Sequence, residues 1–270
     1  MEAGPKWWLK TAVNAFPEDR ENMPQSVENS VLVVDDDLDA GQNLGDILND
    51  LGYHVGVASD PFIALEMATK EKYGIALLDF KMPGMDGLTL ARKLKELCCS
   101  TIVILTTAYA NRDTLASAHR NGVWKVFSKP LDIQLLIPGI EEASSQPLVL
   151  LVEDDAELCH SLTDVLHDKG YRVCFSNDIE RGLSMLGSSN FQVVLIDMKL
   201  PGGFGDEVHQ KVRDIAGGAR VVLMTGYRQE MEERIRRSLD AGADAVFYKP
   251  FQMPEVLAIL KRLTDITPDG

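Results

Sequence analysis

The chain has 270 residues, of which 45% are hydrophobic, so it can bury either one large core or two of ordinary size. Its formal net charge of −14 disfavours broad affinity for nucleic acid or anionic membrane, because phosphate-rich surfaces repel such a protein. No apolar stretch approaches the roughly 18 residues of a membrane-spanning helix, and the N-terminus lacks the pattern of a cleavable signal. The four cysteines have no CxxC spacing, which disfavours zinc. We therefore expect a soluble, cytoplasmic protein that binds neither nucleic acid nor membrane directly.

Residues 1–29 form an N-terminal extension that precedes the regular patterns of the chain. Helical spacing would place five apolar side chains on one face, namely Trp8, Leu9, Ala12, Val13 and Phe16. The pattern favours an amphipathic helix that folds back on the neighbouring domain. A docking or dimerisation element remains the alternative.

Residues 30–143 alternate between short apolar, β-branched runs and longer segments with apolar residues three and four positions apart. This alternation predicts a βα repeat. The expected strands are 30–35, 53–58, 75–79, 101–106 and 123–128, and the expected helices are 38–51, 61–72, 87–97, 111–121 and 132–143. Pro138 falls inside the last helix, where a proline removes a backbone hydrogen bond and is expected to kink or end the helix.

A short linker, 144–147, leads into a second unit that repeats the first over residues 148–265, followed by a tail at 266–270. The expected strands of the second unit are 148–153, 171–175, 191–197, 219–224 and 244–248, with helices between and after them. The polar landmarks recur at nearly constant offset. Asp36 and Asp154 are 118 positions apart, as are Asp79 and Asp197, and also Thr107 and Thr225, whereas Lys129 and Lys249 are 120 apart.

The central strands are continuously apolar, as in 75–78 and 193–196. Such strands are covered on both faces, which is typical of a parallel sheet with helices on each side. The sequence therefore predicts an α/β fold class with two tandem, doubly wound, five-stranded parallel sheets.

Carboxylate, threonine and lysine side chains stand where the predicted strands end, once in each unit. The first set is Asp35, Asp36, Asp79, Thr107 and Lys129, and the second is Glu153, Asp154, Asp197, Thr225 and Lys249. Functional side chains of a doubly wound sheet gather at the carboxyl ends of its strands, so each set is expected to share one cleft.

Three carboxylates in one cleft repel one another by roughly 4 kcal/mol per pair, at about 4 Å and an effective dielectric near 20. A cation must relieve this repulsion, and all-oxygen ligation with room for waters and a phosphate suits Mg²⁺ better than zinc or calcium. One carboxylate can then attack phosphorus while the metal and a lysine neutralise the phosphoryl oxygens and a threonine hydroxyl donates a hydrogen bond.

These motifs resemble the complete set of a response-regulator receiver domain, the chemotaxis-regulator-like domain of two-component signalling. In the first unit they are Asp35-Asp36, the segment from Asp79 to Gly87, Thr107-Ala108 and Lys129-Pro130. In the second they are Glu153-Asp154, the segment from Asp197 to Gly202, Thr225-Gly226 and Lys249-Pro250-Phe251. The resemblance extends from about residue 30 to 265 and implies the flavodoxin-like (βα)5 fold in each unit.

The resemblance also implies roles for individual residues. Asp79 and Asp197 would be phosphoacceptors, Asp36 and Asp154 direct Mg²⁺ ligands, and Asp35 and Glu153 ligands through water. The backbone carbonyls of Lys81 and Lys199 would complete the metal shell, Lys129 and Lys249 would pair with the phosphoryl group, and Thr107 and Thr225 would bond its oxygen. Lys81 with Tyr109, and Lys199 with Tyr227, are implied to tune hydrolysis of the acyl phosphate.

The implied function is a two-component response regulator that takes phosphoryl groups from a histidine kinase or histidine phosphotransfer protein and acts on a downstream protein partner. A homodimer is left open. The alternative is a phosphorelay intermediate or phosphate sink with one regulatory receiver. A conventional enzyme is not expected beyond self-phosphorylation and slow autodephosphorylation. A Mg²⁺-dependent phosphatase of the haloacid-dehalogenase kind is a remote alternative, because its motif is broken at Leu38-Asp39 and in the duplicate at Glu153.

Three further observations carry expectations. Val126 and Val246 stand where many receivers have an aromatic switch residue, so coupling to the surface is expected to differ from the usual one. Trp124, at the start of the fifth strand, marks either an interface or a ring packed under a helix. The histidines, at 54, 119, 160, 167 and 209, are expected on the surface or at its boundary.

Overall fold

The computed structural model describes residues 29–108, 115, 117–118, 121–201 and 203–264. The chain forms two compact units, Met1–Ser144 and Ser145–Gly270, each of which is described by itself. The predicted N-terminal helix, most of the predicted helix over 111–121 and the C-terminal tail lie outside the described residues. Within the described part of the chain, every helix is too short or too polar to cross a lipid bilayer.

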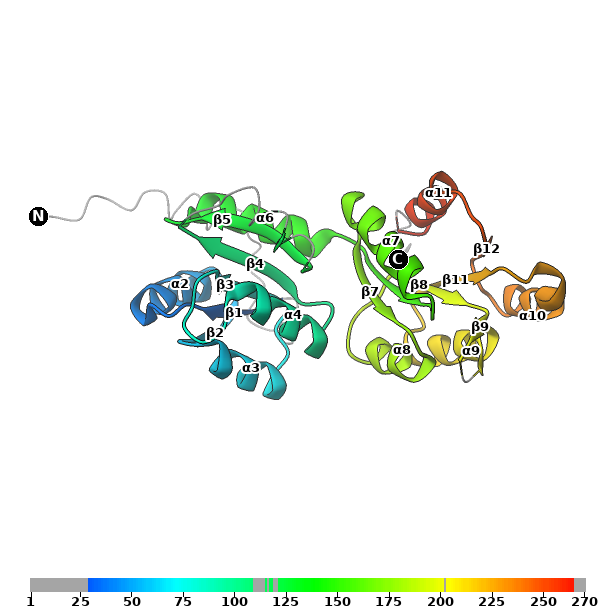
Figure 1. Cartoon of the computed structure of the whole chain (residues 1–270), viewed down its shortest axis with the longest axis horizontal. Helices are drawn as coiled ribbons and strands as arrows, with labels where there is room; N and C mark the ends of the chain where they lie inside the picture. Colours follow the sequence, from blue (N-terminus) through cyan, green and yellow to red (C-terminus); the bar gives the residue numbers. More distant parts are fainter. Residues whose placement is uncertain (1–28, 109–114, 116, 119–120, 202, 265–270) are drawn as a thin grey trace, which may run out of the picture. The chain divides into compact units, whose positions relative to one another are not determined.

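The first unit is a five-stranded, all-parallel sheet in the order β2-β1-β3-β4-β5 (Figure 1). Its strands are β1 Ser30–Val34, β2 His54–Ala58, β3 Ile75–Asp79, β4 Ile102–Thr107 and β5 Val123–Ser128, and its described helices are α2 Leu38–Asp50, α3 Pro61–Lys70, α4 Gly87–Leu97 and α6 Ile133–Ser145. The strand order reverses between β1 and β3, and ligands bind at this point in doubly wound folds.

The alternation of side chains along the strands gives the first unit two apolar cores, one on each face of its sheet. Leu32, Leu78 and Leu105 point to one face and pack with residues of α3 and α4. Val33 and Leu77, from neighbouring positions, point to the other face and pack with residues of α2 and α6. All five positions of β1 and of β3 are buried, because helices cover both faces.

The second unit repeats this architecture with the order β12-β11-β8-β6-β7 (Figure 1). Its sheet strands are β6 Leu148–Val152, β7 Arg172–Ser176, β8 Val193–Asp197, β11 Arg220–Thr225 and β12 Ala245–Tyr248, and its helices are α7 Ala156–Asp168, α8 Ile179–Leu186, α9 Gly205–Ile215, α10 Arg228–Asp240 and α11 Met253–Thr264. Apolar residues of β6, β8 and β11 pack with those of α7 and α11 on one face. The prediction of two five-stranded parallel α/β units is confirmed.

Aspartates begin many of the helices, because a side-chain oxygen can accept from the free N–H groups of the first turn. Asp60 accepts from the amides of Phe62 and Ile63 at 2.8 and 3.0 Å, and Asp86 accepts from the amide of Thr89 at 2.7 Å. The helix α9 differs, since Phe204 precedes it and supplies no side-chain cap.

A two-stranded antiparallel hairpin, β9 Lys199–Leu200 with β10 Gly203–Phe204, is a feature of the second unit that the sequence patterns did not predict. It lies directly between β8 and α9 and so follows the predicted phosphoacceptor Asp197. Two residues per strand are too few for an alternating pattern to be recognised.

Of the two expected effects of Pro138, an end of the helix is wrong, because α6 continues through this residue to Ser145, and a kink stays a prediction. Leu136, Ile140 and Ala143 are fully buried on the same face of α6, and this burial outweighs the loss of one backbone hydrogen bond. Gly139 lets the helix approach β5, since a Cβ there would lie 3.2 Å from the Phe127 ring. Trp124 is half-buried in this packing, which agrees with the second of its two readings.

The expectation for the histidines is wrong at one position. His209, on α9, is only 2% exposed. His54 and His160 are exposed, and His119 lies outside the described residues.

Candidate functional site

In the first unit, Lys129 lies between two carboxylates at the carboxyl edge of the sheet. Its Nζ is 2.7 Å from Oδ2 of Asp35, which follows β1, and 2.7 Å from Oδ1 of Asp79, which ends β3. Both aspartates are buried, whereas about a third of the lysine side chain is exposed. The structure therefore brings together three predicted residues that are separated by up to 94 positions in sequence.

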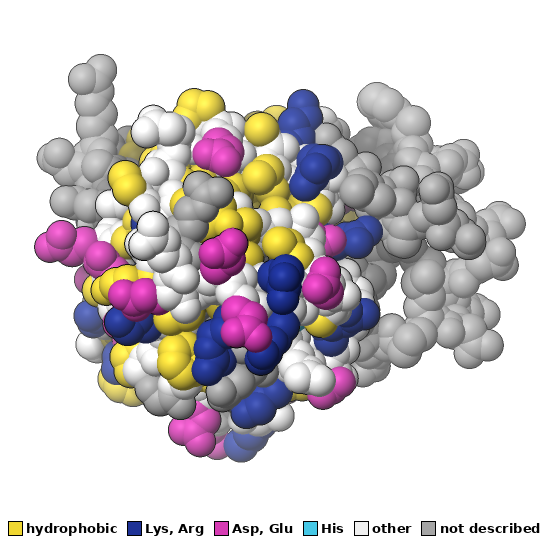
Figure 2. Space-filling view, turned by 90° about the vertical axis from the view of Figure 1, so that its right-hand side faces the viewer, with side chains coloured by type: hydrophobic (Ala, Val, Ile, Leu, Met, Phe, Trp, Pro, Cys, Tyr) yellow, Lys and Arg dark blue, Asp and Glu magenta, His cyan; other side chains and the backbone are white. Residues whose placement is uncertain are grey.

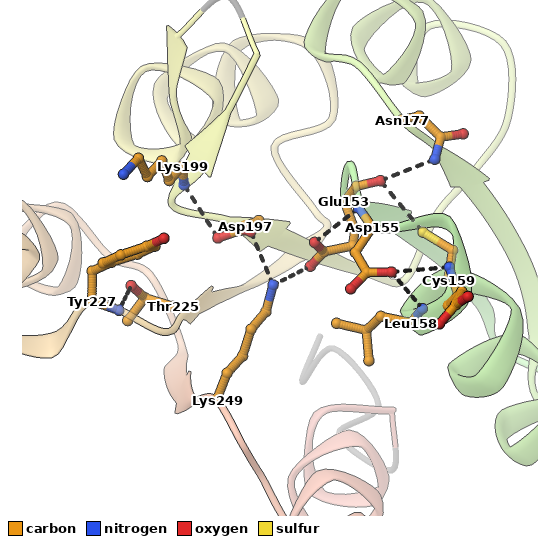
Figure 3. Close-up of polar contacts among 11 residues, drawn as sticks. Glu153, Asp155, Leu158, Cys159, Asn177, Asp197, Lys199, Thr225, Tyr227 and Lys249 are labelled. Carbon is orange, nitrogen blue, oxygen red and sulfur yellow. Dashed lines mark hydrogen bonds and ion pairs between the residues drawn. The ribbon is translucent and has the colours of Figure 1, made fainter.

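The second unit has the same arrangement with a glutamate in place of the first aspartate (Figure 3). The Nζ of Lys249 lies 2.6 Å from Oε2 of Glu153 and 2.9 Å from Oδ2 of Asp197. Glu153 is 1% exposed, and the lysine is more enclosed than its counterpart. In Figure 3 the lysine side chain reaches up between the two carboxylates.

The charges of each pocket perturb one another. Burial by itself would lower the pKa of Lys249, but hydrogen bonds to Glu153 and Asp197 and the charges of both outweigh it and raise the pKa. The pKa of Lys129 is raised in the same way by Asp35 and Asp79. Burial, followed by the charge of Asp197, raises the pKa of Glu153, although Lys249 opposes this. Both lysines are therefore held as ammonium ions at neutral pH.

Backbone amides fix the orientation of each carboxylate. The amide of Lys81 donates to Oδ2 of Asp79 at 2.9 Å, so both oxygens of this aspartate have a donor. The amide of Lys199 donates to Oδ1 of Asp197 at 3.2 Å. Asp35 likewise accepts from the amide of Asp37 at 3.0 Å. Each predicted phosphoacceptor is thus held by one backbone N–H and one ammonium.

The two units differ in how closely the third carboxylate, Asp36 or Asp154, lies to the two carboxylates that contact the lysine. In the second unit, Glu153, Asp154 and Asp197 each offer an oxygen within 4.8 Å of the others, a spacing that can hold one metal ion. Among the residues that the structure describes, the first-unit trio does not form such a group, although Asp36 is exposed just as Asp154 is. The oxygen-only donor set fits Mg²⁺ in either unit, since this ion keeps several waters and needs few protein ligands. The second site is the better formed of the two.

The predicted threonines lie on the adjacent strand end. Thr107 and Thr225 are buried at the ends of β4 and β11, and their carbonyls accept from the amides of Lys129 and Lys249, each at 2.8 Å. The hydroxyl of Thr225 accepts from the amide of Tyr227 at 3.0 Å. This contact tethers the start of α10 to the site, as Figure 3 shows.

An exposed ring and an ammonium stand next to the second site. The Nζ of Lys199 lies 4.1 Å from the centroid of the Tyr227 ring, close enough for a cation–π contact. Tyr109, the counterpart of Tyr227, lies outside the described residues.

Two glycines beside the sites were not recognised as structural requirements from the sequence. A Cβ on Gly87 would lie 2.4 Å from the carbonyl oxygen of Asp79, and one on Gly205 would lie 2.6 Å from that of Asp197. A side chain at either position would therefore push against the backbone of the predicted phosphoacceptor. The signal was available, since these glycines share the offset of the two aspartates.

Comparisons with known proteins identify a family for the chain. The family described as response regulator receiver domain matches the chain twice, over residues 31–141 and 149–261. A response regulator receiver protein of Anaeromyxobacter sp. (strain Fw109-5) is 28% identical over 232 residues, which cover 86% of this chain and 94% of that protein. Sporulation initiation phosphotransferase F of Bacillus subtilis (strain 168) is 34% identical over 112 residues, covering 42% of this chain and 90% of the relative.

Among solved structures, a CheY-like response regulator receiver domain protein from Methanospirillum hungatei JF-1 is 31% identical, covering 44% of this chain and 94% of that one with a TM-score of 0.43. The family match covers most of the chain and falls once on each compact unit. The chain belongs to the response regulator receiver domain family, with one receiver domain in each of its two units, and is a two-component response regulator.

Proposed function

We propose that each unit accepts a phosphoryl group on one carboxylate, Asp79 in the first and Asp197 in the second. The observation that carries this proposal occurs twice: a lysine ammonium within 3 Å of the carboxylates that follow the first and third strands of the sheet. The buried aspartate supplies the nucleophile, and the lysine lies where it can follow the charge onto a phosphoryl group.

The donor is a phosphohistidine on a kinase or phosphotransfer protein. The aspartate oxygen forms a bond to phosphorus as the bond between phosphorus and the imidazole nitrogen breaks, and the imidazole takes up a proton. The nucleophilic oxygen must first be released from its lysine contact, and the backbone amide of Lys81 or Lys199 holds the other oxygen.

Mg²⁺ fits the acidic pocket of each unit, and when bound it supplies positive charge to the phosphoryl oxygens. Asp36 and Asp154 would bind it directly, Asp35 and Glu153 through water, and the backbone carbonyls of Lys81 and Lys199 would complete the shell. Thr107 and Thr225 would donate their hydroxyl groups to a phosphoryl oxygen. The close approach of Glu153, Asp154 and Asp197 supports this set more strongly in the second unit.

We place the protein in the cytoplasm, where kinase donors act, and assign its output to contacts with a downstream protein. The domain limits that accompany this proposal are 30–143 and 148–265. Both units retain a full charged set, which favours a regulator with two active receivers. A phosphate sink remains the second candidate, because the tighter carboxylate group in one unit favours unequal lifetimes of the two acyl phosphates.

The test is incubation of the full chain with acetyl phosphate and Mg²⁺, followed by phosphate-affinity electrophoresis. Two shifted species are expected, one lost in Asp79→Asn and the other in Asp197→Asn. Matched controls are Asp46→Asn and Asp164→Asn, which change exposed aspartates at equivalent positions of α2 and α7 and should leave both species in place. Labelling that survives both site substitutions would refute the assignment.

The same experiment distinguishes the two candidate functions. Time courses after removal of the donor give the lifetime of each acyl phosphate. Similar lifetimes support a regulator with two active receivers, whereas rapid loss from one unit only supports the sink.

A further inference from the structure

A cavity of about 360 Å³ opens on the second unit between α9 and α10. Residues of α9 line one wall, including His209 and Arg213, and residues of α10 line the other, including Arg237 and Ser238. Arg213, Arg237 and Ser238 lie in the second half of their helices and His209 lies near the middle of α9, whereas the carboxylate site adjoins the helix starts. None of the residues that line the cavity belongs to that site. The cavity is therefore separate from the site that contains Asp197.

One of the residues that line this cavity, His209, has a buried nitrogen without a partner in the part of the chain that the structure describes. His209 is 2% exposed, and its Nε2 is buried without a hydrogen-bond partner among the described residues. A buried polar atom that lacks a partner costs about 1–3 kcal/mol, so a structure tends to supply one. Burial, followed by the charge of Arg213, lowers the pKa of this histidine, although Asp244 opposes the shift. The ring is therefore neutral at neutral pH and keeps one N–H donor.

The first unit provides an internal comparison, because its fold is the same. The position equivalent to His209 is Ala91 on α4, which is fully buried. Ser238 stands four residues before Gly242, and Ala118 stands four residues before Gly122. Both glycines have a positive φ, and both Ser238 and Ala118 are buried. The first unit thus has two buried alanines where the second has His209 and Ser238.

Two guanidinium groups supply positive charge at the same place. Arg213 donates through one terminal nitrogen to the carbonyl of Ala241, and Arg237 forms an ion pair with Glu233 through one terminal nitrogen. Each guanidinium has five N–H donors, so further donors remain for a ligand. Gly242 leaves room for Arg213, because a side chain there would collide with the guanidinium. Asp214 is the one acidic residue in the described lining.

The view onto the α10 side of the second unit agrees with this account. Figure 2 shows Lys and Arg side chains gathered on that side, with Asp and Glu side chains among them. A small ligand with several acceptor oxygens can reach such donors, whereas a large polyanion would also meet the acidic side chains.

We propose that this cavity is a second binding site, for a small oxyanion of the phosphate or carboxylate class, held by Arg213, Arg237 and Nε2–H of His209. The oxyanion accepts hydrogen bonds from the guanidinium groups and gives the buried imidazole nitrogen the partner that it lacks. In the first unit Lys95 stands at the position of Arg213, but Ala91 and Ala118 replace His209 and Ser238, so the set is incomplete among the described residues there.

The test is isothermal titration calorimetry on the full chain with inorganic phosphate, sulfate and succinate. A chelator is present throughout, so that the carboxylate pockets hold no metal and repel anions. We expect one saturable site per chain. Binding of phosphate and sulfate alone identifies the phosphate class, and binding of succinate alone identifies the carboxylate class.

The double substitution His209→Ala with Ser238→Ala copies the residues of the first unit and should weaken binding at least tenfold. Removal of the unpaired buried nitrogen offsets part of the cost of the cavity that the shorter side chain leaves, and the melting temperature is measured beside the binding. Arg237→Met changes an exposed side chain and should also weaken binding, whereas Arg262→Met, an equal loss of charge on α11, should not.

The imidazole proton signals provide a second readout. Of the five histidines of the chain, the one whose signal disappears in the double variant should shift on addition of the anion. Absence of saturable binding by all three anions, or equal isotherms for the wild type and the double variant, would overturn the proposal. Loss of acetyl phosphate labelling has no bearing on this outcome, because the calorimetry uses neither Mg²⁺ nor a phosphodonor.

Discussion

Replacement of Lys249 by methionine removes the ammonium that holds two buried carboxylates together and keeps the length of the side chain. The Nζ contacts to Glu153 and Asp197, at 2.6 and 2.9 Å, are each worth roughly 6 kcal/mol at an effective dielectric near 20, before desolvation is counted. Desolvation cancels much of this, and loss of one partner from a buried pair costs about 3–5 kcal/mol. Because Glu153 is 1% exposed, its carboxylate has little contact with bulk water that could compensate for loss of the lysine.

Differential scanning calorimetry in the presence of a chelator measures this loss. At about 4 °C per kcal/mol for a unit of this size, the transition of the second unit should fall by roughly 12–20 °C. Addition of Mg²⁺ should restore part of the stability, by about 2.7 kcal/mol at a hundredfold excess over its Kd. The gain should be larger in Lys249→Met than in the wild type, because the lysine no longer competes for the same oxygens.

The chain provides its own controls for this experiment. Lys129→Met should lower the transition of the first unit instead, and by less, because about a third of that lysine is exposed. Lys261→Met, at an exposed position of α11, should change neither transition. An unchanged second transition in Lys249→Met, or equal stabilisation of variant and wild type by Mg²⁺, would refute the reasoning.

Two further predictions concern backbone contact and pH. Gly205→Ala should destabilise the second unit by about 1–3 kcal/mol in urea unfolding and reduce phosphoryl labelling of Asp197, because the added Cβ would press on the carbonyl of that aspartate. Gly87→Ala should have the same two effects in the first unit, through the carbonyl of Asp79. Labelling of both variants at the wild-type rate would contradict this contact. His209→Ala should flatten the dependence of stability on pH. Since its folded pKa is lowered by burial and Arg213, with Asp244 opposing, the unfolded chain binds the proton first. Stability is therefore present above the unfolded pKa of about 6.5 and is lost as pH falls from there through the folded pKa, with a slope of at most about 1.4 kcal/mol per pH unit. Equal slopes in variant and wild type would exclude the histidine as the cause.

The fold could be predicted because its determinants are local and periodic. Both faces of β1, β3, β6 and β8 are buried, so these strands are continuous apolar runs that stand out from the helical segments. The repeat of the chain then fixed equivalent positions, and the strand ends placed the carboxylates and lysines at one edge. This reasoning located Asp79 and Lys129 correctly relative to each other.

The other features of the two sites depend on interatomic distances, which the spacing of residues along the sequence does not determine. Sequence reasoning treated the two pockets as equivalent, but the carboxylate group of the second unit is tighter than that of the first. Sequence reasoning also assigned the lysines to a bound phosphoryl group, whereas in the structure of the unphosphorylated chain they form ion pairs with the carboxylates. The burial of His209 could have been inferred, because the repeat aligns it with Ala91, and each of the two follows an apolar residue, Val208 or Leu90.

The ammonium group that lies between two carboxylates in each pocket, Lys129 or Lys249, lowers the negative charge of the pocket and so determines which charge of metal ion the pocket accepts best. In the second unit three carboxylates and one ammonium have a formal charge of −2 when all four groups are ionised, since three charges of −1 add to one of +1. A monovalent ion would leave half of this charge uncompensated, and a trivalent ion would exceed it, whereas a divalent ion makes the pocket electrically neutral. An acyl phosphate carries about −1.5 to −2 charges where the free carboxylate carried −1, so phosphorylation adds a net charge of about −0.5 to −1. The phosphorylated pocket then differs from the unmodified one chiefly in its charge. This change in charge alters the electrostatic potential at the neighbouring segments, which can respond to it.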